Sequence, residues 1–169
     1  MTTDQEVVGS NPTGCTLIIM KVYTLTFKHI INKNLEEVFT FFKSPENLSR
    51  ITPAKLKFKI LTPTPIEMKE GQLIDYTITL FGKRVHWRTM ITLYDNNKSF
   101  IDQQLKGPYQ MWHHKHTFKE NNSGVEMIDT INYVVPFGIL GQIVNYFYLQ
   151  KELNSIFQHR KEVINNIFK

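Results

Sequence analysis

The sequence predicts an α+β fold in which a strongly curved antiparallel sheet wraps around one long C-terminal helix. Two observations support this. The first is the order of elements: one strand, two short helices, six further strands, so about seven in all, and then the long helix. The second is that an antiparallel sheet must bury one face, and the C-terminal helix is its one large apolar partner. The helix is therefore expected to lie across the sheet.

The first elements follow from local patterns. Residues 21–31 alternate and are rich in β-branched and aromatic residues, which predicts a strand. Asn34 can cap a helix that carries two acidic residues in its first turn. Pro45 begins a second short helix, because proline fits the first helical position, and Pro53 ends it.

Six further strands are predicted between turn-rich segments. The separators are built from Gly, Pro, Asn, Asp, Lys and Thr, and their regular spacing predicts a meander of antiparallel hairpins. The strands are expected at about residues 56–62, 72–82, 84–95, 98–106, 109–120 and 124–135.

The last element is one long helix over about residues 139–168. One stripe of residues recurs along it with spacings of three and four, which places the stripe on a single helical face. A curved sheet around one helix need not fill its interior, so a pocket is expected beside this face. The stripe consists of Leu149, Leu153, Ile156, Arg160, Val163 and Ile167.

Hairpin registers predict which side chains face the helix. We place turns at residues 82–83 and 107–108 and a loop at 121–124. The expected cross-strand pairs are Ile78 with Trp87, Gln103 with Trp112, His116 with Asp129 and Trp112 with Tyr133. The predicted inward-facing, ligand-binding residues are Tyr76, Trp87, Gln103, Trp112, His114, His116, Asp129, Tyr133 and Arg160.

Length and composition fit a single domain with a substantial core. Of the 169 residues, 41% are hydrophobic and 12% aromatic, which excludes an intrinsically disordered chain. The net charge of +5 comes from scattered basic residues, so we expect no nucleic-acid partner and do not favour a membrane partner. The one cysteine, Cys15, excludes a disulfide framework and a cysteine-based zinc site.

Nothing in the sequence predicts secretion or membrane insertion. No stretch reaches the roughly 18 consecutive apolar residues of a membrane helix, and the most apolar run, at 134–149, contains Pro136, Gly138 and Gly141. The N-terminus lacks the basic start and apolar core of a signal peptide. We therefore expect a cytoplasmic protein.

Residues 1–19 look foreign to the rest of the chain. They show no periodicity, and their peptide "VVGSNPTGC" resembles the in-frame translation of the T-arm of a tRNA gene. One expectation is that the native chain starts at Met20 and that residues 1–19 result from a gene start assigned too far upstream. The alternative is that residues 1–19 form a disordered tail. On both interpretations residues 20–169 form a single domain.

From Met20 on, the chain carries the stretches "FFKSPENLSRITPAKLKFKILTP", "WRTMITLYD", "FIDQQLKGPYQMWHHKHTF" and "FQHR". With this order of elements it resembles the START/polyketide-cyclase superfamily (SRPBCC, helix-grip fold), and within it a bacterial subfamily of ligand-binding SRPBCC proteins. The resemblance implies a hydrophobic cavity between the sheet and the C-terminal helix. Members bind lipids, sterols, quinones or polyketides, and some cyclise or dehydrate them. It implies no cofactor, and no catalytic residue is carried over from it.

The stretch "GPYQMWHHKHTF" allows three interpretations of its H-x-H pair. His114 and His116 share the inward face, whereas His113 faces outward. With Asp129 they could form a metal site of two histidines and one carboxylate. His116 could instead be a general base oriented by Asp129. The interpretation we favour is a polar patch on the pocket wall; the catalytic pair comes second, and we expect no metal.

Arg160 interrupts the apolar stripe of the helix. We expect it to pair with Asp129 or Asp102 inside the protein, because buried arginines are usually paired. The alternative is that it meets the acidic head group of a ligand. The inward aromatic side chains either stack on a ring-containing ligand or pack as ordinary core.

The sequence therefore predicts a domain that binds a small, mostly apolar ligand, as a monomer or homodimer. The first alternative is a cyclase- or dehydratase-type enzyme that uses His116 with Asp129. The second is a membrane or protein interaction module. It rests on the apolar stretch just after the connector "VPFGILG" at 135–141, which could dock on a membrane or a partner. The connector itself is either a movable flap over the cavity or a plain connector.

Overall fold

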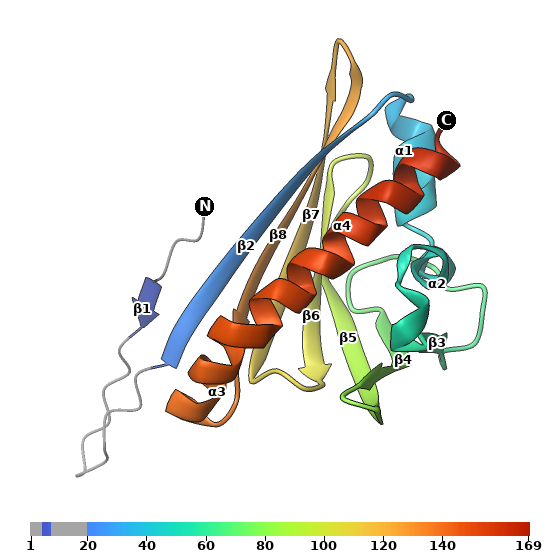
Figure 1. Cartoon of the computed structure of the whole chain (residues 1–169). Helices are drawn as coiled ribbons and strands as arrows, with labels where there is room; N and C mark the ends of the chain where they lie inside the picture. Colours follow the sequence, from blue (N-terminus) through green and yellow to red (C-terminus); the bar gives the residue numbers. More distant parts are fainter. Residues whose placement is uncertain (1–4, 8–19) are drawn as a thin grey trace.

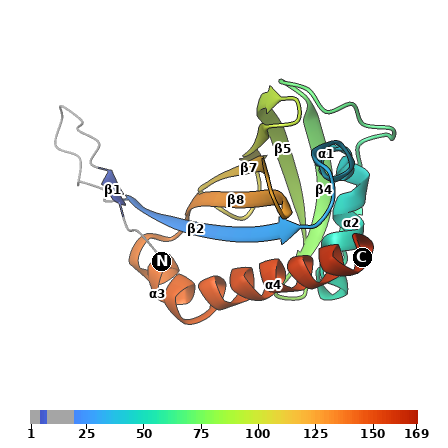
Figure 2. The ribbon, with the colours of Figure 1, turned by 90° about the horizontal axis from the view of Figure 1, so that it is seen from above.

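The computed structural model describes residues 5–7 and 20–169, and it shows one curved antiparallel sheet with a long helix across one face (Figure 1; Figure 2). The strands follow the spatial order β1-β2-β8-β7-β6-β5-β4-β3. Their bounds are β1 Gln5–Val7, β2 Met20–Ile31, β3 Lys59–Ile60, β4 Leu73–Leu80, β5 Lys83–Asp95, β6 Ser99–Lys106, β7 Met111–Asn121 and β8 Gly124–Val134. The predicted fold class and order of elements are confirmed.

Short helical segments follow β2, as predicted, but the described residues form four of them where two were expected. Asn34 caps the first: its Oδ1 accepts a hydrogen bond from the Glu37 amide at 2.8 Å, which satisfies one of the free N–H groups of the helix start. The predicted strand at 56–62 shortens to β3, because a 3₁₀ turn ending at Lys57 occupies its beginning. The segments are α1 Leu35–Phe42, η1 Pro45–Asn47, α2 Leu48–Ile51 and η2 Ala54–Leu56.

The C-terminal helix begins and ends close to the predicted residues but is not uniform. It consists of α3 (Gly138–Val144), the π-helical turn η3 (Asn145–Leu149) and α4 (Gln150–Ile167). The most buried side chains of α4 are Leu153, Phe157 and Ile164. Two of these flank the predicted stripe, because the curved sheet contacts a broad face of the helix.

Apolar side chains fill both ends of the space between helix and sheet. Under α1, Phe39 packs edge-on against Phe118 of β7, with ring centroids 5.2 Å apart. Under the first half of α4, Phe157 and Trp112 belong to a second cluster. Side chains from both clusters also line a cavity between the sheet and α4.

Two of the predicted registers preserve the expected faces. In β7–β8, His116 lies opposite Asp129, as predicted. The β4–β5 hairpin turns one residue earlier than expected, at 81–82, so Tyr76 rather than Ile78 lies opposite Trp87. This moves each pairing by two residues, and a shift by an even number leaves the inward face unchanged.

The predicted β6–β7 register is wrong by one residue. Gln103 lies opposite His113 rather than Trp112, and Asp102 therefore lies opposite His114. A slip of one residue exchanges the two faces of a strand. Asp102 consequently points toward the cavity, and Gln103 does not line it.

The loop between β6 and β7 explains the slip. It is not a two-residue turn at 107–108. Instead residues 107–110 form a longer connection, and the Gln104 side chain holds it by donating a hydrogen bond to the Tyr109 carbonyl at 2.7 Å. On the other side of β6, the β5–β6 pairing contains two register shifts, and such shifts cannot be predicted from the alternation of residues in the sequence.

Of the segment 1–19, only β1 is described, and it pairs with the start of β2. Residues 1–4 and 8–19 lie outside the described residues. The origin of this segment and its expected disorder therefore stay predictions, as does the single-domain boundary at Met20.

Candidate functional site

A cavity of about 160 Å³ lies between the sheet and α4. It is smaller than the roughly 300–1,000 Å³ typical of sites for drug-sized ligands, so it suits a small molecule. Its wall is mostly apolar and comes from β4, β5, β6, β7, the short helices and α4. Six of the nine predicted site residues line it: Tyr76, Trp87, Trp112, His114, His116 and Arg160.

The other three predicted site residues do not line this cavity. Asp129 lies behind the two histidines, on β8. Tyr133 is fully buried and donates its hydroxyl to Asn145. The prediction of Gln103 as a site residue is wrong, because it rests on the wrong β6–β7 register. The Gln103 backbone carbonyl accepts a hydrogen bond from the Thr89 hydroxyl at 3.1 Å.

Aromatic rings form one side of the cavity. Tyr76 stacks on Trp87 with centroids 5.8 Å apart and planes 15° apart. Trp87 in turn meets Trp112 edge-on at 5.5 Å. The indole Nε1 of Trp87 is buried and has no hydrogen-bond partner among the described residues. This wall offers flat apolar surface and one free donor.

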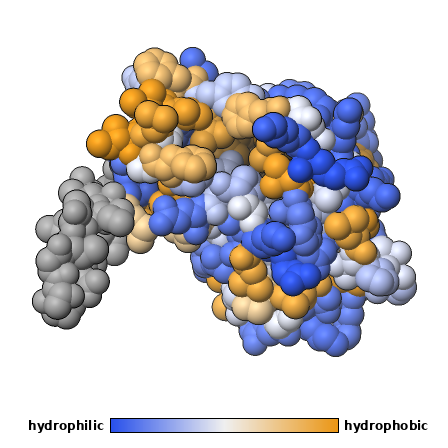
Figure 3. Space-filling model, turned by 90° about the horizontal axis from the view of Figure 1, so that it is seen from below, coloured by the Kyte–Doolittle hydropathy of each residue, from blue (hydrophilic) through white to orange (hydrophobic). Residues whose placement is uncertain are grey.

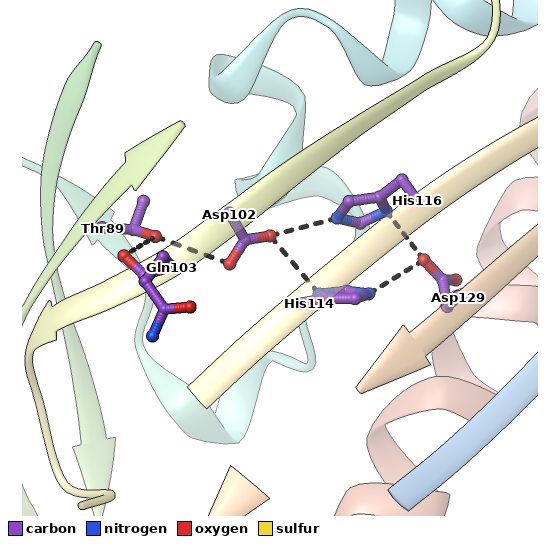
Figure 4. Close-up of polar contacts among 6 residues, drawn as sticks. All are labelled: Thr89, Asp102, Gln103, His114, His116 and Asp129. Atoms are coloured by element: carbon purple, nitrogen blue, oxygen red, sulfur yellow. Dashed lines mark hydrogen bonds and ion pairs between the residues drawn. The ribbon is translucent and has the colours of Figure 1, made fainter. Parts of the chain in front are cut away.

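Beside this wall lies a closed cluster of two histidines and two aspartates (Figure 4). His114 has Nε2 at 2.9 Å from Asp129 Oδ1 and Nδ1 at 3.4 Å from Asp102 Oδ2. His116 has Nε2 at 3.1 Å from the same Asp102 oxygen. Its Nδ1 lies 2.7 Å from Asp129 Oδ1, but off the axis of a hydrogen bond. Each imidazole therefore bridges both carboxylates.

The strands determine this arrangement. His114 and His116 are two residues apart on β7, so they share a face, and their ring centroids are 3.8 Å apart. Asp129 reaches them from β8, where it lies opposite His116, and Asp102 reaches them from β6, where it lies opposite His114. Thr89 of β5 extends this series of polar contacts, with its hydroxyl 3.5 Å from Asp102 Oδ1.

Burial and charge act in opposite directions on the cluster. Burial would raise the pKa of Asp129 and of Asp102, but the imidazoles outweigh it and hold the pKa of both carboxyl groups below their usual range. Burial lowers the pKa of His114, and neighbouring His116 lowers it further. At His116 the carboxylates outweigh burial and raise the pKa. The cluster thus keeps both carboxyl groups ionised and makes His116 the more readily protonated of the two imidazoles.

Arg160 does not form the predicted ion pair within residues 5–7 and 20–169. Its Nε is buried without a hydrogen-bond partner there, and its guanidinium lies over the Phe157 ring, 4.6 Å from the centroid. Its positive charge still lowers the pKa of Asp102 from a distance. Arg160 therefore presents an uncommitted donor at the cavity wall.

A second pocket lies on the other side of Phe157, between β2 and α4, with a volume of about 420 Å³. Asp129 and Arg160 both reach it, so they separate the two pockets. Its further lining includes Lys28, His29 and Lys161. Lys28 and Lys161 therefore place positive charge at the pocket behind the histidine cluster.

Sequence reasoning missed one residue of the site, Asp102, and one buried anchor of the C-terminal helix, Asn145. Asp102 was considered only as a partner for Arg160, because the assumed turn at 107–108 turned it outward. Asn145 was treated as an interruption of an apolar run, although it is fully buried. The signal for Asp102 was its position twelve residues before His114, close enough for one hairpin to join them, but a loop of unknown length hides the register.

Comparison with models of protein families and with curated proteins gives no match. Solved structures do match. The protein CV1439 of Chromobacterium violaceum superimposes with a TM-score of 0.65 at 11% identity, over 86% of this chain and 96% of that one. Major latex-like protein 151 of Panax ginseng superimposes with a TM-score of 0.64 at 12% identity, over 87% and 97% of the two chains.

A third match is the di-domain ARO/CYC StfQ from the steffimycin biosynthetic pathway, with a TM-score of 0.67 at 12% identity. The match covers 87% of this chain and 50% of StfQ. At such identities the superpositions show the fold. This chain has the helix-grip architecture of these proteins, which confirms the resemblance to the START/polyketide-cyclase superfamily at the level of fold.

Proposed function

We propose that the chain binds a small, mostly apolar ligand that carries a hydrogen-bond-accepting or acidic group, in the cavity between the sheet and α4. The observation that carries the proposal is an apolar cavity whose wall holds two buried donors, Trp87 Nε1 and Arg160 Nε, that find no hydrogen-bond partner among the described residues. An unpaired buried donor costs about 1–3 kcal/mol. A ligand oxygen that meets these donors removes this cost, whereas apolar ligand surface fills the rest.

Decanoic acid is a suitable probe, because it combines an apolar chain with a carboxylate. Native mass spectrometry of the purified chain and calorimetric titration with decanoic acid should show one bound molecule per chain. Ile78→Phe narrows the cavity and should weaken binding at least tenfold. Ile30→Phe enlarges an exposed side chain far from the cavity lining and should not change it. No binding by the wild type, or equal binding by the two variants, would exclude the proposal.

A second candidate function, a cyclase- or dehydratase-type reaction, is supported by the histidine cluster. His116 lines the cavity, and both carboxylates hold its ring. Its raised pKa favours the protonated form, which suits a general acid acting on a ligand carbonyl or a leaving hydroxyl. With a polyketide-type substrate, His116→Gln should lose turnover and keep affinity. Equal loss of both would contradict catalysis.

A third candidate function, docking on an anionic membrane, is supported by the surface of α3 and η3. Large apolar side chains are exposed there, including Phe137 at 84%, Ile139 at 76% and Phe147 at 66%. Figure 3 views this end of the molecule and shows hydrophobic residues gathered beside hydrophilic ones. Within the described chain no helix is long and apolar enough to cross a bilayer, so the fitting mode is interfacial.

The charge around this surface favours anionic lipid over a second protein copy. Residues 130–150 contain no charged side chain; Lys151 follows them directly, and the exposed Lys83 and Arg84 lie in the neighbouring β4–β5 hairpin. Phe81 ties the basic hairpin to the apolar segment, with its ring 5.2 Å from that of Tyr148. Apolar insertion and lysine attraction to lipid head groups would act together.

Vesicle co-sedimentation tests the docking. The chain should bind phosphatidylcholine vesicles that contain phosphatidylserine, less at high salt, and much less to phosphatidylcholine alone. Phe147→Ser should reduce binding severalfold, whereas Ile30→Ser, at an exposed site of β2, should not. Vesicle binding that does not depend on salt would contradict the role of the basic residues. A dimer in solution that Phe147→Ser dissociates would identify a second copy of the chain as the partner.

A further inference from the structure

Two histidine nitrogens and one carboxylate oxygen lie close together in the polar part of the cavity wall. His114 Nδ1 lies 3.4 Å and His116 Nε2 3.1 Å from the same oxygen, Asp102 Oδ2. Ligand atoms of all three residues lie within 4.8 Å of one another. Nitrogen and oxygen ligands bind first-row metal ions at about 2.0–2.2 Å, so neighbouring ligand atoms in a metal site are about 3.0–3.4 Å apart. Two of the three separations already have this value.

Asp129, the fourth member of the cluster, contacts the second ring nitrogen of each histidine. Asp129 Oδ1 is 2.9 Å from His114 Nε2 and 2.7 Å from His116 Nδ1. Histidine ligands of metals almost always donate their second ring N–H to such an outer carboxylate or carbonyl, which orients the ring. Asp129 hydrogen-bonds one of these nitrogens, His114 Nε2, and lies in ion-pair distance of the other, His116 Nδ1. The arrangement leaves the other nitrogens of both histidines directed at Asp102.

Charge and access fit a divalent ion as well. The cluster brings two carboxylates into the protein interior, where an unpaired negative charge is costly, and a doubly positive ion would balance them with both imidazoles neutral. Asp102, His114 and His116 all line the cavity, whereas Asp129 does not. The remaining coordination positions would thus open into the cavity.

We propose that Asp102, His114 and His116 form a metal site of two histidines and one carboxylate, with Asp129 as the outer partner of both rings. Two imidazoles and one carboxylate with open positions suit first-row divalent ions of the Fe²⁺ to Zn²⁺ range. The site differs from the one considered on sequence grounds, in which Asp129 was the carboxylate ligand. It does not depend on the proposed apolar ligand, because the three residues alone make it.

Cobalt is the appropriate probe, because bound Co²⁺ absorbs visible light according to its ligands. Chelator-treated full-length chain should bind one Co²⁺ with a new visible absorption, and Zn²⁺ should displace it. Asp102→Asn keeps the shape of the side chain and should weaken binding at least tenfold, as should His114→Gln. Asp129→Asn should weaken it about 10- to 100-fold, the usual effect of losing an outer partner.

His113→Gln is the matched control, because His113 lies between the two histidines on β7 but on the other face. It should bind Co²⁺ as the wild type does. Circular dichroism of each variant establishes that the fold is retained. The proposal is overturned if the wild-type chain binds no Co²⁺ at micromolar concentration. It is equally overturned if folded Asp102→Asn and His114→Gln bind Co²⁺ as tightly as His113→Gln.

Discussion

Tyr133 and Asn145 join the last strand to the C-terminal helix: the tyrosine hydroxyl donates a hydrogen bond to Asn145 Oδ1 at 2.9 Å, and both side chains are fully buried. Asn145 is the first residue of the π-helical turn η3. The bond therefore anchors the helix to the sheet at the point where its regular geometry changes. Residues 146–148, which follow, are exposed.

Asn145→Ala should destabilise the fold by about 1–3 kcal/mol, because the Tyr133 hydroxyl loses this buried acceptor. Urea unfolding measures the change. Asn154→Ala is the control, since Asn154 is exposed and its amide donates only to the Gln150 carbonyl one turn before it. It should cost less than about 0.5 kcal/mol. Equal losses in the two variants would mean that the Tyr133 bond adds nothing.

Acid should remove the stabilisation provided by Asp75. Asp75 accepts hydrogen bonds from Arg88 Nε at 2.9 Å and from His86, and the Arg88 bond, against the effect of burial, lowers the pKa of Asp75. A carboxylate whose folded pKa lies below its unfolded value of about 3.9 stabilises the fold above that pH. The contribution is lost as the pH falls through the folded pKa.

Asp75→Asn should therefore be less stable than the wild type at pH 7, by less than about 1 kcal/mol because Arg88 is partly exposed. The difference should shrink as the pH falls below the unfolded pKa of about 3.9 and through the lower folded pKa. Urea midpoints between pH 7 and pH 2.5 measure it. Asp95→Asn, which breaks an exposed pair with Lys98, is the control. A difference that grows on acidification contradicts the assignment.

The faces of the strands were predictable, but the partner across β6 was not. Alternation alone indicates that Trp112, His114 and His116 share the buried face of β7, because side chains repeat every two residues. The residue opposite His114 depends instead on the loop at 107–110 and on shifts in the β5–β6 pairing. These leave no periodic pattern, and so Gln103 was selected in place of Asp102.

The interior role of Arg160 was also beyond sequence reasoning. The stripe pattern places it correctly beside the cavity, but whether an arginine finds a carboxylate depends on distances that helix periodicity does not contain. The two aspartates nearest to it are already bridged by His114 and His116. The imidazoles already contact both carboxylates that the arginine was expected to pair with.

Arg160→Met should therefore cost less than about 1 kcal/mol of stability, the range of a contact between a cation and an aromatic ring. A buried ion pair would cost about 3–5 kcal/mol when broken, and urea unfolding separates the two cases. For binding, the variant should lose at least tenfold in affinity for decanoic acid but little for decanol. An equal loss of affinity for both probes would mean that Arg160 contributes to the shape of the cavity but does not bind the ligand carboxylate.

Gly141 should be required for the position of α3. A β-carbon built there would lie 1.8 Å from the backbone carbonyl oxygen of Pro136 and 3.2 Å from the Val135 side chain. Because backbone atoms cannot move aside without displacing the chain, Gly141→Ala must push α3 away from the end of β8. Val144→Ala, at an exposed position of the same helix, creates no such contact.

Hydrogen exchange should show faster exchange of the amides in residues 138–149 of Gly141→Ala, whereas β7 and β8 keep their protection, because α3 packs on few other elements. Val144→Ala should leave the exchange of this segment unchanged. If α3 carries the membrane contact, vesicle binding should fall in Gly141→Ala while decanoic acid affinity changes less. Unchanged exchange in Gly141→Ala would mean that α3 does not need the close approach to Pro136.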